Sequence, residues 1–377
     1  MTAALPCTIA NFFVVTYFVS AWLQNLIKYE WEAYKGPGGQ WQWRVKGGNG
    51  PKAPKAHGSG EQDIIMLTTD VAFVVDKEYR RYVEEFARDR NAFDQTFADV
   101  WYKLTHRDVG PPTRLLGPMI PPPKEWQFPL PDPPIELADM KMVENAIIKA
   151  LCKQSSMEVL LLRLAMNSAS TFRYTDYLGG CNGARIRFHL HWEVNNGLDK
   201  AIHFLRPVKQ AFGNSLSWAD LIVLAGNVVV KKIGAPQDLP SVGGRTDAND
   251  GAGWNALIYM NASYPKSVEE VVQRTTLRGL SSKEYVALAF PYFSTVQSLK
   301  TLMETDQQPP SKYNDMLAVS LKFEPLFRRW VEYYISVGDN EYKYDFASTW
   351  TKVMNIDRFS GPVRNTALID IDQQSRL

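Results

Sequence analysis

The chain contains two copies of one sequence pattern, which lie about 248 residues apart. The first copy is DKEYRRYVEEF at residues 76–86, followed by FADVWYKLTHRD at residues 97–108. The second copy is EPLFRRWVEYY at residues 324–334, followed by FASTWTKVMNID at residues 346–357. An internal repeat marks copies of one structural unit. We therefore expect the carboxy-terminal ends of two copies of one fold, with the amino-terminal part of only one.

The overall charge gives no reason to expect a polyanionic partner. The 377-residue chain has a formal net charge of +2 and a pI of about 8.2, and its basic residues are scattered among acidic ones. A nucleic-acid binder usually carries a clustered basic surface, so we predict no nucleic-acid partner. The three cysteines, Cys7, Cys152 and Cys181, do not suit a disulfide scaffold and indicate a reducing compartment or buried thiols.

The stretch at residues 155–193 carries the most specific motifs. It reads as an apolar helix from Val159 to Ala165, a small-residue turn from Ser168 to Thr171 and a glycine-rich loop, GGCNG, at residues 179–183. With SASTFR, GARIR and WEVN in this order, the stretch resembles the class I haem peroxidases, most closely the carboxy-terminal half of the catalase-peroxidases. This resemblance implies a mainly α-helical, haem-peroxidase-like domain whose motifs lie on helices or loops.

The same resemblance assigns three residues to the peroxidase pocket. In an active family member, this helix carries an arginine, an aromatic residue and a histidine, and the histidine is the general base that takes a proton from peroxide. Here Arg163 matches the arginine, but Met166 takes the aromatic position and Asn167 the histidine position. An amide has no pKa near neutrality and cannot move that proton. We therefore predict no catalytic, cofactor-binding or metal-binding residues and no cofactor.

The helix that supplies the iron ligand in the family is expected at residues 280–299. By resemblance, the ligand position falls on Tyr292 or Phe293. Phenylalanine cannot bind iron, whereas tyrosinate can, but it needs a cation to lower its pKa, and no arginine is close in sequence. Core packing is therefore the favoured role for Tyr292.

The acidic residue that orients the ligand in the family is also missing from this part of the chain. The repeat places Ala318 opposite Asp70, and Asp315 lies three residues before Ala318. Asp70 has no ligand histidine to accept from, so we expect it to be a helix N-cap before Val71.

Two histidines form a weak metal-site candidate. His189 and His191 alternate along a stretch that we expect to be extended, so both rings would face one side and could hold zinc. No cysteine or carboxylate stands at a known ligand spacing, which favours a structural role.

The resemblance extends over most of the chain and sets the expected domains. YEWEAYKGPGGQWQW at residues 29–43, and two amphipathic helices expected within residues 66–108, are similar to the end of the family's first half. SLSWADLIVLAGNVVVKKIGAP at residues 215–236 resembles a helix of its second half. We expect an apolar amino-terminal helix at residues 1–28, a remnant of the amino-terminal peroxidase domain at 29–109, a proline-rich linker at 110–134, a peroxidase-like carboxy-terminal domain at 135–360 and a tail at 361–377.

Residues 8–27, TIANFFVVTYFVSAWLQNLI, have no ionisable side chain apart from Tyr17. As a helix with a rise of ~1.5 Å per residue, they would cover the ~30 Å hydrocarbon layer of a bilayer. A membrane anchor is the favoured interpretation, and a buried helix is the alternative.

These observations together predict a non-catalytic, haem-free pseudoenzyme of the catalase-peroxidase family. Its expected role is that of a structural or accessory subunit of a larger membrane protein complex, in the mitochondrial inner membrane or the plastid thylakoid. Its expected partners are other subunits of that complex and the lipid bilayer, through residues 8–27. The alternative is a divergent haem peroxidase or catalase-peroxidase with an unusual ligand.

Overall fold

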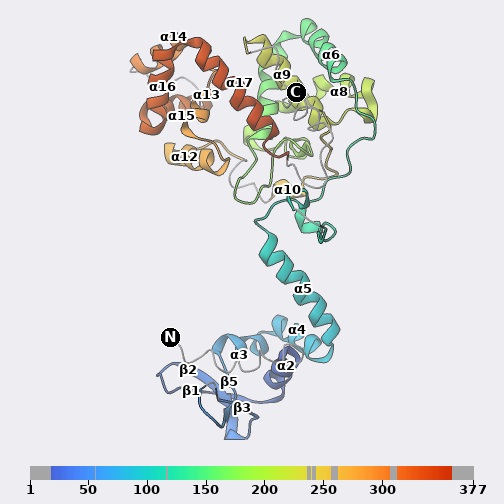
Figure 1. Ribbon diagram of the computed structural model, residues 1–377, viewed down its shortest axis with the longest axis vertical. Coiled ribbons are helices and arrows are strands. Elements are labelled where there is room, and N and C mark those ends of the chain that lie inside the picture. Colours follow the sequence, from blue (N-terminus) through green and yellow to red (C-terminus); the bar gives the residue numbers. More distant parts are fainter. Residues whose placement is uncertain are drawn as a thin grey trace. The chain divides into compact units, whose positions relative to one another are not determined.

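The computed structural model describes residues 18–55, 57–115, 118–235, 239, 243–255, 262–305 and 312–358. The fold is mainly α-helical, as predicted, and the chain divides into two compact units, Met1–Thr105 and His106–Leu377 (Figure 1). The predicted tail at residues 361–377 lies outside the described residues. The domain boundaries expected at residues 28, 109, 134 and 360 stay predictions.

Short antiparallel strands and helices build the first unit. One sheet has the order β1-β2-β5, with Trp31 opposite Val45 and Trp43 opposite Met66, and β3 pairs with β4. The strands are β1 (Trp31–Lys35), β2 (Trp41–Val45), β3 (Lys52–Pro54), β4 (Glu61–Asp63) and β5 (Ile65–Met66). The helices are α2 (Phe18–Lys28), α3 (Thr68–Val75), α4 (Lys77–Arg88) and α5 (Arg90–His106). Strands β1 and β2 correct the expectation that the motif at residues 29–43 lies on a helix or loop.

Helix α2 is part of the core of the first unit. Leu23 and Leu26 are buried in a cluster with Met66, Val71 and Val83, which come from β5, α3 and α4. Among the described residues, no helix has the length and apolar character needed to cross a membrane. The described end of the predicted anchor thus packs one face, with Leu23 and Leu26, into this core, while residues 8–17 lie outside the described part.

The segment at residues 66–108 forms three helices where two were expected. Asp76 has an extended backbone and ends α3, and its carboxylate accepts the backbone N–H groups of Glu78 and Tyr79 at the start of α4. Asp70 is not the N-cap of α3 as predicted. It lies in the first turn and accepts the backbone N–H of Leu67, which is the N-cap. Its carboxylate still satisfies a helix-end donor, but from the third helical position.

The second unit packs its helices around α9, in which every residue from Ala219 to Val230 is buried. Helices α6 and α7 pack against α9, and Gly226 allows a close approach, because a Cβ there would lie 2.6 Å from the Cβ of Ala165. The helices are α6 (Met140–Lys153), α7 (Glu158–Ala169), α8 (Leu198–Phe212), α9 (Trp218–Lys232), α10 (Ala252–Asn255), α12 (Val268–Leu277), α13 (Ser282–Ala287), α14 (Val296–Glu304), α15 (Lys312–Phe323), α16 (Pro325–Val337) and α17 (Asp339–Asn355).

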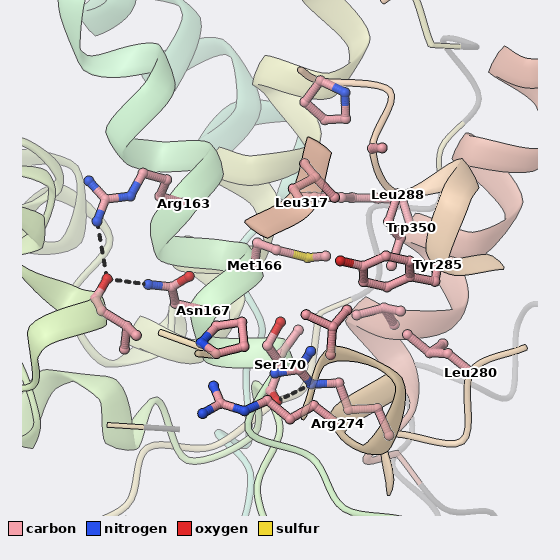
Figure 2. Close-up of a pocket in the computed structure, with 18 of the residues that line it drawn as sticks. Arg163, Met166, Asn167, Ser170, Arg274, Leu280, Tyr285, Leu288, Leu317 and Trp350 are labelled. Atoms are coloured by element: carbon pink, nitrogen blue, oxygen red, sulfur yellow. Dashed lines mark hydrogen bonds between the residues drawn. The ribbon is translucent and has the colours of Figure 1, made fainter. Parts of the chain in front are cut away.

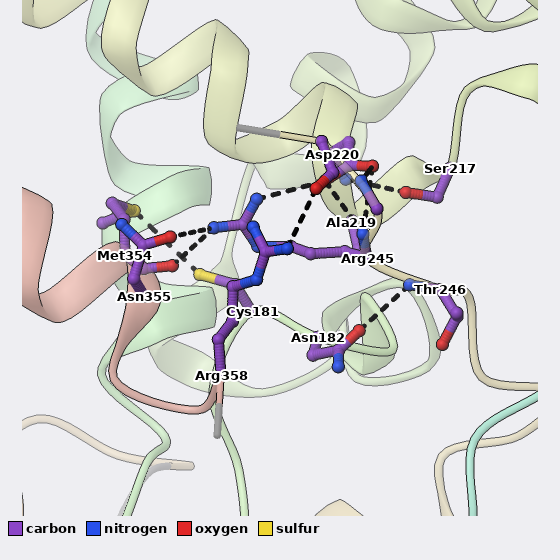
Figure 3. Close-up of polar contacts among 12 residues, drawn as sticks. Cys181, Asn182, Ser217, Ala219, Asp220, Arg245, Thr246, Met354, Asn355 and Arg358 are labelled. Carbon is purple, nitrogen blue, oxygen red and sulfur yellow. Dashed lines mark hydrogen bonds and ion pairs between the residues drawn. The ribbon is translucent and has the colours of Figure 1, made fainter. Parts of the chain in front are cut away.

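A buried ionic network ties the start of α9 to the end of α17 (Figure 3). Arg245 donates to Asp220 at 3.1 Å and to the carbonyl oxygen of Met354 at 2.8 Å, and both members of the ion pair are buried. The Asp220 carboxylate also accepts the backbone N–H of Gly244 at 2.8 Å. A buried charge is tolerated only when it is paired and hydrogen-bonded, so this network holds α17 in one register against α9.

The structure places the two sequence copies on the same helical elements. The first copy forms α4 and α5, and the second forms α16 and α17. Asp76 caps α4 as Glu324 caps α16. The ion pair of Arg80 with Glu84 (2.8 Å) likewise recurs as Arg328 with Glu332 (2.9 Å). The repeat is therefore present in the structure as well as in the sequence.

Candidate functional site

The second unit contains a cavity of about 150 Å³ between α7 and the segment that follows α13 (Figure 2). Helices α12, α15 and α17 complete its walls. Most of the lining is apolar, including Leu162, Val271, Leu280, Leu288, Leu317 and Val353. The polar side chains are therefore few, and their positions determine what the cavity can bind.

Arg163 and Asn167 line the cavity from α7, where a spacing of four residues puts them on one face. Both donate to the carbonyl oxygen of Val194, Asn167 at 2.8 Å and Arg163 at 3.1 Å, as Figure 2 shows. Asn167 also donates to the side-chain oxygen of Asn195 at 3.0 Å. The amide therefore serves as a double donor that fastens α7 to the loop before α8.

Met166 lies on the same side of the cavity, and its thioether extends toward Tyr285 of α13 (Figure 2). Tyr285 stacks on Phe327 with ring centroids 4.5 Å apart, and its hydroxyl is 3.4 Å from that of Ser320. A methionine fills an irregular apolar gap well. The residue in the aromatic position of the pocket thus acts as packing between α7 and α13.

Two further arginines line the cavity and were not predicted from the sequence, Arg274 of α12 and Arg278, which directly follows the end of α12. Arg278 donates to the carbonyl oxygen of Ser170 at 2.7 Å, across 108 positions of sequence. Arg274 donates to the carbonyl oxygen of Ser263 at 2.8 Å and pairs with Glu270. Their spacing on one helix face is visible in the sequence, but nothing local shows that this face meets α7.

The helix predicted at residues 280–299 is broken. Helix α13 ends at Ala287 and α14 begins at Val296, with Pro291 in the turn between them. Proline has no backbone N–H and disfavours a helical conformation in the residue before it. Phe293 packs partly buried against the core. Tyr292 is 42% exposed and lines the cavity, which corrects the expectation that it packs in the core.

Other predicted residues lie away from the cavity. Ala318 is buried in α15, and the side chain of Asp315 lies outside the described part. His189 is in a turn, not an extended stretch, and its Nε2 lies 2.9 Å from the carbonyl oxygen of Gly251. Burial lowers the pKa of His189. No cluster of three potential metal ligands occurs in the described residues, so nothing there supports the zinc hypothesis.

The cysteines also lie outside the cavity lining. Cys181 is buried, and this burial raises the pKa of its thiol, while Cys152 is exposed. Cys7 falls outside the described residues. A raised pKa keeps Cys181 in the unreactive thiol form.

Comparison of the sequence with known proteins shows which family the region around this cavity resembles. A peroxidase family model matches residues 143–302, which include both α7 and α13. A catalase-peroxidase of Escherichia coli is 33% identical over 417 aligned positions, covering 91% of this chain and 56% of that protein. Over most of its length, the chain is therefore similar to the catalase-peroxidases. A catalase-peroxidase of Natronomonas pharaonis covers 90% of the chain at 33% identity, and one of Yersinia pestis covers 62% at 38% identity.

The similarity to catalase-peroxidases corrects the predicted function. The chain spans a little over half the length of the first two of these relatives. The predicted role as an accessory subunit of a membrane complex is contradicted, because the relatives named above are catalase-peroxidases and no described helix can cross a membrane. The predicted location in an organellar membrane depended on the same segment, and the described residues give it no support. The absence of a nucleic-acid partner stays a prediction.

Proposed function

We propose that the chain acts as a divergent haem peroxidase of the catalase-peroxidase type, with the haem in the cavity between α7 and α13. The observation that carries this proposal is that one cavity is lined by both Arg163 and Tyr292, two residues of the region matched by the peroxidase model. Bound haem would supply the iron that reacts with peroxide.

The donor set of the cavity fits a tyrosine-ligated haem. Proteins hold haem iron through histidine, cysteine, methionine or tyrosine side chains. Tyr292 is the candidate ligand, because it lines the cavity and stands at one of the two positions to which the family resemblance assigns the iron ligand. A tyrosinate needs a nearby cation, and α12 supplies Arg274 to the same cavity. The Nε of Arg274 is buried and has no hydrogen-bond partner within the described residues, so it is a donor available to an anion.

The size of the cavity sets a condition on this proposal. About 150 Å³ is below the ~300–1,000 Å³ of typical ligand pockets, so the cavity must widen to hold haem, and the turn at residues 288–295 forms one of its walls. That turn carries the half-exposed Tyr292. Arg163 would donate a hydrogen bond to peroxide, but it is not a base, and Asn167 already donates both of its amide N–H groups to Val194 and Asn195. We expect peroxide turnover slower by about 10² to 10⁴ than in a site with a histidine base.

Titration of the purified full chain with haemin tests the proposal. We expect a Soret band with one haem per chain, together with slow release of oxygen from peroxide or slow oxidation of a peroxidase dye. Tyr292→Phe should abolish the band. Tyr264→Phe, at another tyrosine that lines the cavity, is the matched control and should keep it. Absence of a Soret band in the wild type would overturn the proposal.

The second candidate is a catalytically inactive member of the family. The specific observation in its favour is that the Asn167 amide already uses both donors on Val194 and Asn195. In this case, the chain does not bind haem and does not turn over peroxide. The haemin titration separates the two candidates directly.

A further inference from the structure

The two copies of the repeated helix differ sharply in burial. In α17, Phe346, Trp350 and Val353 are 0%, 1% and 5% exposed. Their counterparts on α5 are Phe97, Trp101 and Leu104, which are 53%, 57% and 67% exposed. The same sequence pattern thus faces a core in one copy and solvent in the other.

The residues that cover α17 show what this helix face recognises. The indole N–H of Trp350 donates to the side-chain oxygen of Asn227 at 2.8 Å. A Cβ at Gly226 would lie 2.9 Å from the Trp350 ring, so the adjacent glycine makes room for the indole. Phe346 stacks on Phe290 at a centroid distance of 4.9 Å. The buried tryptophan therefore packs against a helix that carries a small residue followed by asparagine. The small residue leaves room for the indole ring, and the asparagine accepts its N–H.

The exposed face of α5 forms a continuous apolar stripe, which we define as Phe97, Val100, Trp101 and Leu104. Its members recur at spacings of three and four, so they share one face of the helix. Phe97 stacks on Trp101 with ring centroids 6.0 Å apart, so the two rings pack against each other on this face. Contiguous exposed apolar side chains of this kind mark interaction sites.

We propose that the α5 stripe binds a peroxidase-type helix that carries a small residue followed by asparagine. The indole N–H of Trp101 donates to the asparagine, as Trp350 does to Asn227. A second copy of this chain cannot offer its own pair, because Gly226 and Asn227 are buried against Trp350. The match to the Escherichia coli relative covers only 56% of that protein, so the relatives contain further polypeptide from which such a helix can come.

Site-specific photo-cross-linking of the tagged full chain in its native cell tests this proposal. Leu104→p-benzoylphenylalanine places the probe within the stripe, and Gln95→p-benzoylphenylalanine, on the opposite face of α5, is the control. We expect Leu104 to cross-link a peptide of a peroxidase-like polypeptide that contains a small residue followed by asparagine. Cross-linking to α5 of a second copy, to an unrelated protein, to nothing, or equally well from position 95 would overturn the proposal.

Variants of Trp101 then test the hydrogen bond, with the probe kept at position 104. Trp101→Phe keeps an aromatic ring but removes the donor, and it should lower the cross-link yield by about fivefold. Trp101→Asp should abolish it. Trp101 is exposed, so both variants should keep the helix content of the wild type by circular dichroism. An unchanged yield in Trp101→Phe would contradict the assigned recognition of asparagine.

Discussion

The side-chain amide of Asn167 donates to the carbonyl oxygen of Val194 at 2.8 Å, so the residue in the family's histidine position holds two segments of backbone together. Arg163 donates to the same oxygen. The position has thus changed from a proton carrier, as the family resemblance implies it once was, to a structural donor.

Replacing this donor should destabilise the second unit. Asn167→Ala removes two hydrogen bonds and should lower the free energy of unfolding by about 1–3 kcal/mol. Asn167→Asp keeps the shape but sets a carboxylate against the oxygens of Val194 and Asn195, so it should cost more at pH 7 than at pH 4. Urea denaturation at both pH values measures the difference. Equal stability of the wild type and Asn167→Asp at pH 7 would show that the amide is not a donor.

Gly180 should tolerate no side chain. Its φ is +95°, and a Cβ there would lie 2.3 Å from a carboxylate oxygen of Asp357. Gly180→Ala should therefore cost more than the ~1–2 kcal/mol expected for left-handed backbone strain alone. Gly197 is the matched control, because its φ is +83° and nothing lies within 4 Å of a Cβ. Comparable losses in Gly180→Ala and Gly197→Ala, measured by urea denaturation, would argue against the steric clash.

Breaking the buried ion pair should be costly. Asp220→Asn leaves the charge of Arg245 buried without its partner, and we expect a loss of about 3–5 kcal/mol. Glu332→Gln removes the exposed partner of Arg328 and should cost under ~1 kcal/mol. Thermal and urea unfolding of both variants measure these values. A loss in Asp220→Asn no larger than in Glu332→Gln would be inconsistent with the network holding α17 in place.

The stability of the second unit should fall as the pH rises through the pKa of Asp357. Burial raises this pKa in the folded state, although Arg245 acts in the opposite direction. The folded chain therefore binds the proton more tightly than the unfolded chain, and stability is lost between the unfolded and the folded pKa. Asp357→Asn removes this dependence. The stability of the variant relative to wild type should increase from acidic to neutral pH, and a constant difference across that range would refute the assignment.

Local signals in the sequence placed several elements correctly. Helix α9 lies within the predicted segment at residues 215–236. The repeat aligned Asp76 with Glu324, and the structure shows that both residues cap a helix. These features depend on periodicity and on helix-end chemistry, which act over a few residues. Pro291 is such a local signal too, and it lies in the turn that interrupts the helix predicted at residues 280–299.

Contacts between segments that are distant in the sequence decided the features that local signals did not predict. By itself, the sequence determined the mainly helical fold, the repeat and the loss of the histidine base at Asn167. Only the tertiary structure brought Arg274 into the cavity with Tyr292, gave Asn167 its acceptor at Val194, and buried Trp350 while leaving Trp101 exposed. The physical reason is that two helices built on one sequence pattern have similar local preferences. Their burial depends on which other helices pack against them, and no stretch of a few residues encodes that.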